Sequence, residues 1–312
     1  MTSAGMTRPI LFGASTPSGT ALRLQAQAVP ADSTPLVAAG RRRPQQWPDT
    51  LPFVPCDLLA APGDASTGLA QFGSQRWISF APIWHLAPFL DQWLAFDPRH
   101  SHLLRGVVAC SSSSVITKRF AANRFDRQLV QRLREAETLV QRRCADHGIP
   151  CTILAPTLIY GAAGPYGDRN LSQLLQLMRR LPVLPLPADT GLRQPVHCHQ
   201  LAAVALHMST RQAEGDRGLP AHLPLGGDDT MTYEQMLRRL QAATAQGDAA
   251  RRCRLLPLPT RLFQLLASPL LLRSPKGFEA VLRISADLAG FSAAHGVLGE
   301  PARPFPVRPL AP

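Results

Sequence analysis

The sequence predicts an α/β protein built on a doubly wound parallel sheet, with a smaller C-terminal lobe. In the first half of the 312-residue chain, short apolar runs alternate with polar stretches of helical periodicity, which is typical of βαβ units. The first apolar run ends in a glycine turn, residues 13–19, directly before a helical stretch. A chain of this length is also sufficient for one large core and a second lobe.

Six strands are expected in the first half, because six apolar runs end in polar or turn-forming residues. These predicted strands are 9–12, 36–39, 51–54, 77–80, 106–110 and 151–154. A long polar helix is expected over 124–147, between the last two strands. In a parallel sheet the carboxyl ends of the strands share one edge, so the residues that follow these strands are expected to gather there.

The second half is expected to contain shorter elements. These are a helix over 171–180, a strand over 195–199 and helices over 200–210 and 232–246. The proline-rich segment 181–187 is expected to break the first of these helices. Thr232, with Gln235 three residues later, has the spacing of a capping box. Apolar helical segments and a loop-like tail, 301–312, complete the chain.

The composition narrows the function classes. The formal charge of +12 comes from 33 basic residues, of which only Lys118 and Lys276 are lysines. Abundant arginine, alanine and proline with so little lysine is typical of the codon bias of a GC-rich genome. Because no nucleic-acid-binding motif accompanies the charge, that interpretation is favoured over a dedicated nucleic-acid surface.

The cysteines and the termini indicate a cytoplasmic protein. Six scattered cysteines form no Cys-x-x-Cys pair, which fits a reducing compartment. No signal peptide is expected before the first strand. The longest apolar stretch, 255–272, contains three prolines and Arg261, whereas a membrane span needs about 20 apolar residues.

The glycine turn predicts a dinucleotide-binding site. Glycines let the backbone approach a pyrophosphate, and the helix N-terminus offers unpaired N–H groups and the positive end of its dipole. Thr16 stands where the usual pattern has its middle glycine. The alternative interpretation is a strand–helix turn without a ligand. The candidate cofactor-binding residues of the turn are Gly13, Ser15, Thr16, Ser18 and Gly19.

Arginines follow the second predicted strand, at 41–43. An acidic residue at this place would hold a ribose 2′-hydroxyl, whereas arginine favours a 2′-phosphate. The sequence therefore predicts NADP, with NAD as the alternative cofactor, and Arg41 as a contact. The other interpretation is a solvated cluster of loop charges.

A serine run, 111–114, follows the fifth predicted strand. Hydroxyls at this edge can orient a substrate oxygen, or they can simply form a polar strand end. No Gly-x-Ser-x-Gly motif surrounds them, so a hydrolase nucleophile is excluded. His197 and His199 can share one face of a strand, but no third ligand is evident, and we predict no metal site.

The order and spacing of these features resemble extended short-chain dehydrogenases/reductases of the nucleotide-sugar epimerase/dehydratase group. The resemblance covers nearly the whole chain, from Ile10 to Phe305. Besides the glycine turn, it rests on Asp57, the segment 80–82 (Phe-Ala-Pro), Ser112 three residues before Val115, and the segments 154–161, 191–197, 284–299 and 301–305.

This resemblance implies a Rossmann-like cofactor domain with Asp57 at the adenine, Ala81 beside the cofactor and Pro156 near the nicotinamide. It implies that Ser112, the candidate catalytic hydroxyl, bonds the reacting sugar hydroxyl. The candidate substrate-binding residues are Ser113, Thr157 and Arg193, the last as a phosphate ligand. The cofactor domain is expected at 8–165 with 193–215 returning to it, and the smaller substrate lobe at 166–192 and 216–312.

One departure from the family concerns the chemistry. The family uses a Tyr-x-x-x-Lys pair, in which the lysine lowers the pKa of the phenol for proton transfer. Counting back from Glu137, which resembles the family glutamate, these positions fall on Leu129 and Leu133. None of the three tyrosines has a lysine four residues later. A different base would be needed, or the reaction is lost.

Two functions therefore stay open. The first is hydride transfer on a nucleotide sugar with a non-standard base, and the second is a non-catalytic NAD(P)-binding regulator, redox sensor or assembly scaffold. We expect no specific nucleic-acid partner. A homodimer through the helix at 124–147 is implied by the resemblance. Membrane-surface association through 251–276 is a minor alternative to a packed helical pair, which the sequence favours.

Overall fold

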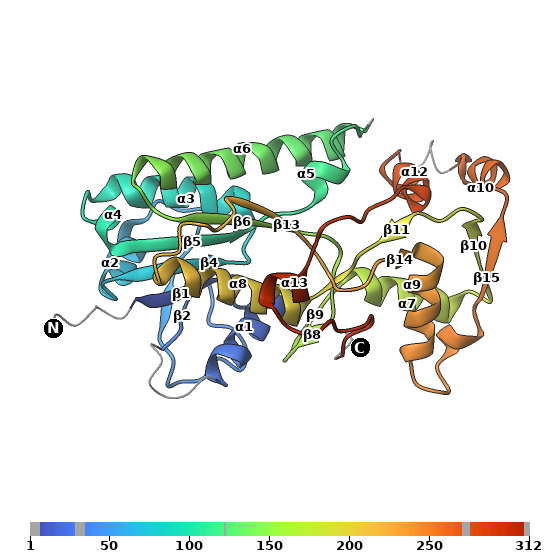
Figure 1. Ribbon diagram of the computed structural model, residues 1–312, viewed down its shortest axis with the longest axis horizontal. Coiled ribbons are helices and arrows are strands. Elements are labelled where there is room, and N and C mark those ends of the chain that lie inside the picture. The colour runs from blue at the N-terminus through green and yellow to red at the C-terminus, as the bar shows by residue number, and fades with distance from the viewer. Residues whose placement is uncertain (1–6, 29–34, 122, 270–274, 309–312) are drawn as a thin grey trace.

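The computed structural model describes residues 7–28, 35–121, 123–269 and 275–308. Its centre is an eight-stranded sheet in which every neighbouring pair is parallel (Figure 1). The strands are β1 (Arg8–Phe12), β2 (Val37–Gly40), β3 (Phe53–Pro55), β4 (Gln75–Ser79), β5 (Leu104–Cys110), β6 (Cys151–Pro156), β13 (His222–Gly226) and β16 (Ser292–Ala293). Their order is β16-β13-β6-β5-β4-β1-β2-β3.

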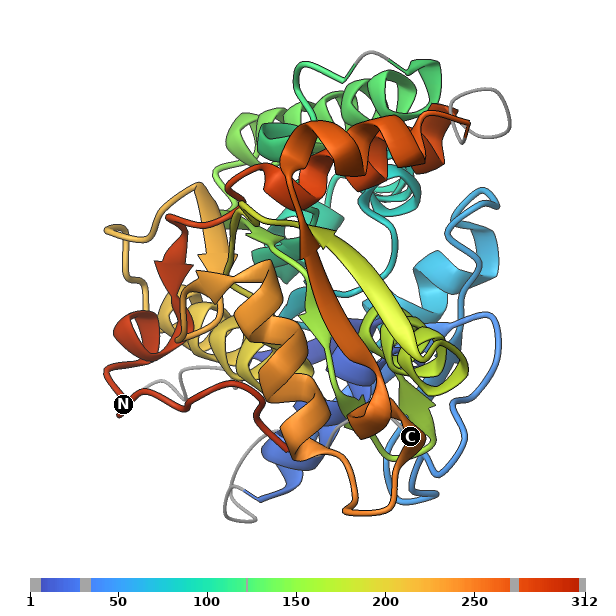
Figure 2. The same cartoon turned by 90° about the vertical axis from the view of Figure 1, so that its right-hand side faces the viewer.

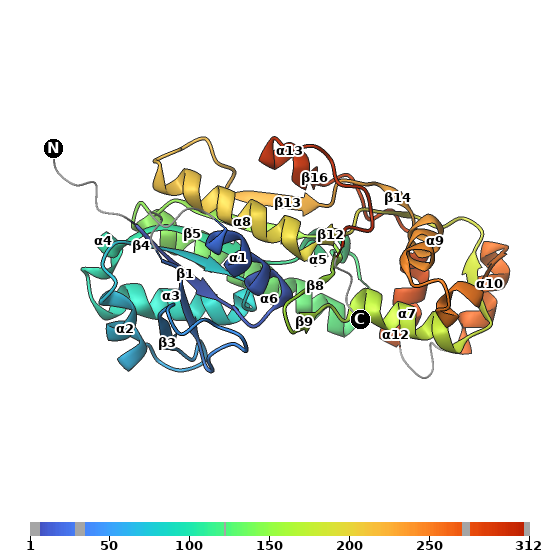
Figure 3. The ribbon, with the colours of Figure 1, turned by 90° about the horizontal axis from the view of Figure 1, so that it is seen from below.

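Helices cover both faces of this sheet, which confirms the predicted doubly wound fold (Figures 1 and 3). One face packs on α3 (Ile83–Phe96) and α6 (Arg124–Asp146), and the other on α1 (Pro17–Gln27), α8 (Cys198–Ala213) and α13 (Ala294–Leu298). Shorter helices α2 (Gly63–Ala70), α4 (His100–Leu103) and α5 (Ser114–Thr117) lie in the connections. Ile10 and Phe12 belong to the first core and Leu11 to the second, because successive strand residues face opposite sides.

A second group of elements lies beyond the carboxyl ends of the strands (Figures 1 and 2). It contains α7 (Asn170–Arg180), α9 (Tyr233–Ala243), α10 (Thr260–Ala267) and α12 (Pro275–Leu282), with short 3₁₀ turns η1 (Ala249–Arg252) and η2 (Arg283–Ser285). Its paired strands are β10 (Val183–Pro187) with β15 (Arg254–Leu258), and β11 (Leu192–Arg193) with β14 (Met231–Thr232). Between the two groups, β7 (Ile159–Tyr160) pairs with β12 (Val196–His197), and β8 (Ala162–Ala163) with β9 (Tyr166–Gly167).

Several predicted elements differ from the observed ones for local reasons. The predicted strand 195–199 is shorter, because the His197 side chain accepts the His199 N–H and so caps α8. Segment 181–187 contains β10 as well as the expected break, since a two-stranded ribbon tolerates proline at its edges. The capping box of Thr232 and Gln235 is confirmed.

The bounds of the two predicted lobes stay a prediction, but one part of them needs a correction. Residues 216–312 were expected in the smaller lobe, whereas β13 pairs with β6 and β16 with β13 in the large sheet. The described part of the tail, 301–308, contains no helix or strand, and 309–312 lie outside the described residues. Of the apolar stretch 255–272, residues 270–272 also lie outside them. None of the described helices is long and apolar enough to cross a membrane.

Candidate functional site

A cavity of about 800 Å³ opens at the carboxyl ends of β1, β2, β3 and β4. In parallel α/β sheets this edge is where ligands bind. The structure brings six of the predicted cofactor-binding residues together in the cavity wall: Gly13, Ser15, Thr16, Arg41, Asp57 and Ala81. The wall does not include Ser18, Gly19 or Pro156, nor any predicted substrate-binding residue.

The glycine turn is as tight as its sequence indicates. Gly13 has φ +76°, and a Cβ on it would lie 2.6 Å from the Ala81 nitrogen. A Cβ on Gly19 would lie 2.3 Å from the Gly13 carbonyl oxygen. Both positions therefore need glycine, one for its backbone conformation and both for close packing. Ser18 is buried behind the turn, so its side chain supports α1 rather than the cavity wall.

Thr16 does not block the turn. Its backbone, with φ −97°, adopts a conformation open to any residue, so glycine is not required there. The Thr16 hydroxyl donates to the Gly13 carbonyl at 2.8 Å and accepts the Gly19 N–H at 3.0 Å. The residue is thus the N-cap of α1, and Pro17 follows at the first helical position.

The arginine cluster after β2 is divided into one paired and two unpaired side chains. Arg43 lies 3.0 Å from an Asp49 carboxylate oxygen and donates to the Pro48 carbonyl at 2.9 Å. Arg41 and Arg42 are exposed in the cavity wall, and neither has a polar partner among the described residues. Two cations without counter-ions at a cavity make that end attractive to an anion.

Across the cavity, Asp57 forms a local turn in which its Oδ1 accepts the Leu59 N–H at 3.0 Å. The neighbouring Cys56 is buried, and burial, with a smaller effect of Asp57, raises the pKa of its thiol to about 12. The thiol is therefore neutral at physiological pH and is a poor nucleophile.

His85 and Tyr166 are among the wall residues that the sequence did not indicate. Tyr166 lies in the hairpin β8–β9, which contacts α1 (Figure 3). Its phenol oxygen accepts the Gln45 N–H at 3.0 Å, so the hairpin is joined to the arginine-bearing loop on the other side of the cavity. A hairpin of two-residue strands has no detectable periodicity, which explains why the sequence did not indicate it.

The serine run lies after β5 but outside the cavity wall. Ser111 donates a short hydrogen bond to the Glu137 carboxylate, whose other oxygen lies 3.7 Å from His222 Nε2. Ser112 Oγ donates to Ser114 Oγ at 3.0 Å. The buried Ser113 precedes α5, and its N–H donates to the carbonyl of Pro156 at 2.9 Å.

Thr157 and Arg193 are also engaged within the chain. Thr157 Oγ1 donates to the Gln194 carbonyl at 2.5 Å. The buried Arg193 guanidinium donates to carbonyls of residues 192, 283, 284 and 286, at 2.6–3.3 Å. It also lies 5.2 Å over the Tyr233 ring, and burial lowers its pKa. A substrate role for either residue stays a prediction, and a diphosphate would have to displace these carbonyls from Arg193.

The two positions predicted for the family Tyr and Lys, Leu129 and Leu133, lie against the core. Leu133 is buried between α6 and the sheet, and Leu129 packs against the same cluster. Lys118, the lysine nearest in sequence, donates to Asp126 at 2.9 Å. Tyr160 is buried, which raises its pKa, and its oxygen accepts the Val307 N–H at 2.9 Å.

The two histidines considered as metal ligands stack with ring centroids 5.4 Å apart. Within the part of the chain that the structure describes, no group of three or more His, Cys, Asp or Glu side chains could hold a metal ion.

No family model and no curated protein matches this sequence. Solved structures do match its fold. UDP-glucuronic acid 4-epimerase from Bacillus cereus, in complex with NAD, is 13% identical over 94% of this chain and 97% of that chain, with a TM-score of 0.58. UDP-glucose 4-epimerase from Thermus thermophilus, also with NAD, is 14% identical over 94% and 99%, with a TM-score of 0.56.

A third match is dTDP-glucose 4,6-dehydratase from Bacillus anthracis in complex with NAD. It is 13% identical, with 82% of this chain and 86% of that chain covered and a TM-score of 0.55. At such identities the likeness shows the fold alone. The chain has the Rossmann-like α/β fold found in NAD-dependent nucleotide-sugar epimerases and dehydratases.

Proposed function

We propose that this protein binds NADP in the cavity at the ends of β1–β4, and that NAD is the weaker ligand. The observation that carries the proposal is the pair Arg41 and Arg42, exposed at the cavity without a polar partner among the described residues. A 2′-phosphate supplies the anion that such a pair lacks, whereas a 2′-hydroxyl does not. In this arrangement the pyrophosphate lies on the N–H groups of the glycine turn, and the adenine lies beside Asp57.

We further propose that the protein acts as a non-catalytic NADP-binding regulator, sensor or scaffold. The positions predicted for the family's proton-transfer pair are Leu129 and Leu133, whose side chains pack against the core. At the opposite end of the sheet edge, Ser112, Thr157 and Arg193 are hydrogen-bonded within the chain. These contacts support a site whose ligand is held mainly at its adenosine end.

A second candidate is hydride transfer on a nucleotide sugar, and the Ser111–Glu137 hydrogen bond favours it. Glu137 would accept the sugar hydroxyl proton through Ser111, in place of a tyrosine. In this case Ser112 and Ser113 would orient the sugar, and Arg193 would exchange its carbonyl partners for a phosphate. The bound nicotinamide would supply the hydride acceptor.

Calorimetric titration of the cofactor-stripped protein with NADP⁺ and NAD⁺ tests the proposed function. Arg41→Ala and Arg42→Ala should each weaken NADP⁺ binding about tenfold, because each removes a charge-assisted hydrogen bond. Neither should change NAD⁺ binding. Arg43→Ala is the matched control, because Arg43 is already paired with Asp49.

Equal affinities of the wild-type protein for the two cofactors would contradict the preference for NADP. An absence of binding for both would contradict the proposed function itself. Oxidation of a nucleotide sugar by wild-type protein, lost in Glu137→Gln, would instead establish the second candidate.

A further inference from the structure

Helix α10 exposes an apolar face. Leu262, Leu265 and Leu266 follow the i, i+3, i+4 spacing that places side chains on one side of a helix. They are 43%, 68% and 63% exposed, whereas Phe263, which points elsewhere, is buried. An amphipathic helix of a globular protein normally turns its apolar face to the core. Here that face is directed outward.

A second group of exposed apolar side chains lies in the α5–α6 connection and the first turn of α6. Phe120 is 86% exposed and Phe125 is 57% exposed. An arginine accompanies each ring: the Arg119 guanidinium carbon lies 4.7 Å from the Phe120 centroid, and that of Arg124 5.7 Å from the Phe125 centroid. Each aromatic side chain is thus exposed together with a cation.

These two groups belong to one edge of the molecule. Glu279 of α12 accepts hydrogen bonds from Asn123 at the start of α6, and Arg283 of η2 bonds Asp126 of α6 and Glu279. Helix α12 in turn contacts α10. The N-terminal end of α6, α12 and α10 therefore follow one another along the same side (Figures 1 and 2). We call the exposed side chains of α10, of the α5–α6 connection and of the first turn of α6 the docking edge.

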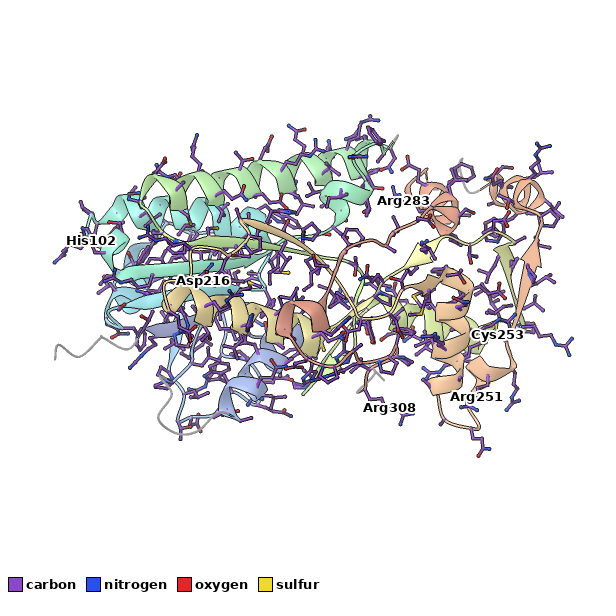
Figure 4. All side chains as sticks on the ribbon, viewed as in Figure 1. His102, Asp216, Arg251, Cys253, Arg283 and Arg308 are labelled. Carbon is purple, nitrogen blue, oxygen red and sulfur yellow. The ribbon has the colours of Figure 1, made fainter. Side chains whose placement is uncertain are left out.

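The chain around the docking edge is strongly basic. Residues 249–269 contain four arginines and no acidic residue. Arg251 lies at the opposite end of this lobe from α10 in Figure 4 and donates to the Ala242 carbonyl. The exposed arginines of the docking edge itself are Arg261 on α10 and Arg119 and Arg124 beside the two phenylalanine rings. The carboxylates closest to the α5–α6 connection, Asp126 and Glu279, are paired with Arg283. The partner of this edge must therefore accept apolar side chains and supply negative charge.

We propose that the docking edge binds the surface of a membrane that contains anionic phospholipids. The leucine and phenylalanine side chains would enter the boundary between headgroups and acyl chains, while the arginines would meet lipid phosphates. A second copy of this chain is a poorer partner, because a two-fold contact would bring the same positive charges together. A nucleic acid would leave the leucine face uncovered.

This proposal does not depend on the proposed NADP site, since the docking edge and the cavity wall share no residue. The exposed face of α10 also differs from the prediction for residues 251–276, which was a packed helical pair. Helix α10 does contact α12, but its Leu265 and Leu266 stay exposed.

Vesicle co-sedimentation of the full-length protein tests the docking edge. Wild-type protein should sediment with vesicles of phosphatidylcholine and phosphatidylglycerol, but not with vesicles of phosphatidylcholine alone. High salt should reduce the bound fraction, because it screens the arginines. The double variant Leu265→Gln/Leu266→Gln should bind at least about tenfold more weakly, because it removes two inserting side chains. Phe120→Ser should weaken binding in the same direction.

Matched controls remove exposed apolar side chains elsewhere. Leu24→Gln on α1 and Phe96→Ser at the end of α3 replace residues that are 40% and 58% exposed, away from the docking edge. Both should bind anionic vesicles like the wild-type protein. All variants should keep the wild-type melting temperature, since the replaced side chains are not in the core.

Three results would overturn the proposal. The first is a wild-type protein that does not sediment with anionic vesicles at low salt. The second is vesicle binding that Leu265→Gln/Leu266→Gln and Phe120→Ser leave unchanged, which would place the membrane contact elsewhere. The third is a dimer in sedimentation velocity that the double variant converts to a monomer, which would show that a second copy covers this edge.

Discussion

Thr16 shows how one hydroxyl can replace a glycine in a tight strand–helix turn. It sits at the position where the usual pattern has its middle glycine, and it both donates to Gly13 and accepts from Gly19. The side chain thereby closes the turn on itself and satisfies one of the unpaired N–H groups at the start of α1. The turn is held by this hydroxyl as well as by the close packing of its glycines.

Removing this hydroxyl should therefore cost stability. Thr16→Ala is expected to lower the free energy of unfolding by about 1 kcal/mol, the usual cost of losing an N-cap. Thr16→Ser retains the hydroxyl and should stay close to wild type. Urea unfolding of both variants measures the difference. Equal losses in the two variants would show that the methyl group, and not the hydroxyl, stabilises the turn.

At the residue scale, the glycine turn could be predicted from the sequence better than the surroundings of Arg193 could. Gly13, Thr16 and Gly19 interact within seven consecutive positions, so their spacing contains the information. Arg193, in contrast, donates hydrogen bonds to carbonyl oxygens of residues about 90 positions later in the chain. No local pattern reveals that such an arginine already has its partners.

The same limit applies to the elements. The six strands of the first half were predicted because each contains a short run of apolar residues. Strand β13 was missed because Pro224 stands in its middle and its partner β6 lies far back in the sequence. Strand β10 was missed because its prolines indicate a break. Where a strand is decided by its partner and not by its composition, a single sequence gives no indication of it.

A buried ionic cluster joins α5, α6 and η2. Asp126, which is nearly inaccessible to solvent, accepts from Lys118 at 2.9 Å, from Asn123 at 2.9 Å and from Arg283 at 2.5 Å. Figure 4 shows Arg283 beside α12, near the start of α6. Desolvation alone would raise the pKa of the Asp126 carboxyl, but the hydrogen bonds from these partners outweigh it and hold the pKa below its usual value.

This cluster should make stability depend on pH. Because the folded-state pKa of Asp126 is lowered, its contribution is complete above about pH 4, near the pKa of an unfolded aspartate, and is lost as the pH falls further. Asp126→Asn should cost about 3 kcal/mol at pH 7, since Lys118 and Arg283 keep their charges without the carboxylate. Chemical denaturation of the wild-type protein and of Asp126→Asn, from about pH 3 to about pH 7, measures both the pH dependence and the cost of the substitution.

The control for this prediction lies at the other end of the same helix. Asp146→Asn removes a half-exposed carboxylate that lies 3.7 Å from Arg143, and its cost should be below about 0.5 kcal/mol at any pH. If Asp126→Asn shows the same pH dependence as the wild-type protein, another carboxyl group is responsible for the acid sensitivity.

Across the whole molecule, the two halves of the strand-end region differ in how their polar groups are used. On the β1–β4 side an open cavity displays two arginines that have no polar partner in the part of the chain that the structure describes. On the β5–β6 side, hydroxyls and Arg193 are bonded to the chain itself, and Tyr160 is held by the tail. We therefore expect a ligand to gain most of its interactions on the first side, where Arg41 and Arg42 have no partner among the described residues to exchange.

This difference predicts how ligands change thermal stability. NADP⁺ at about 100 times its Kd should stabilise the protein by about 2.7 kcal/mol, which raises the melting temperature by about 5 °C or more. A nucleotide sugar added to the NADP⁺ complex should raise it no further, because the groups expected to bind it are already satisfied. A further rise, retained in Arg41→Ala but lost in Arg193→Ala, would show that a sugar nucleotide does displace those carbonyls, and the enzyme would then replace the non-catalytic binder as the better account of this fold.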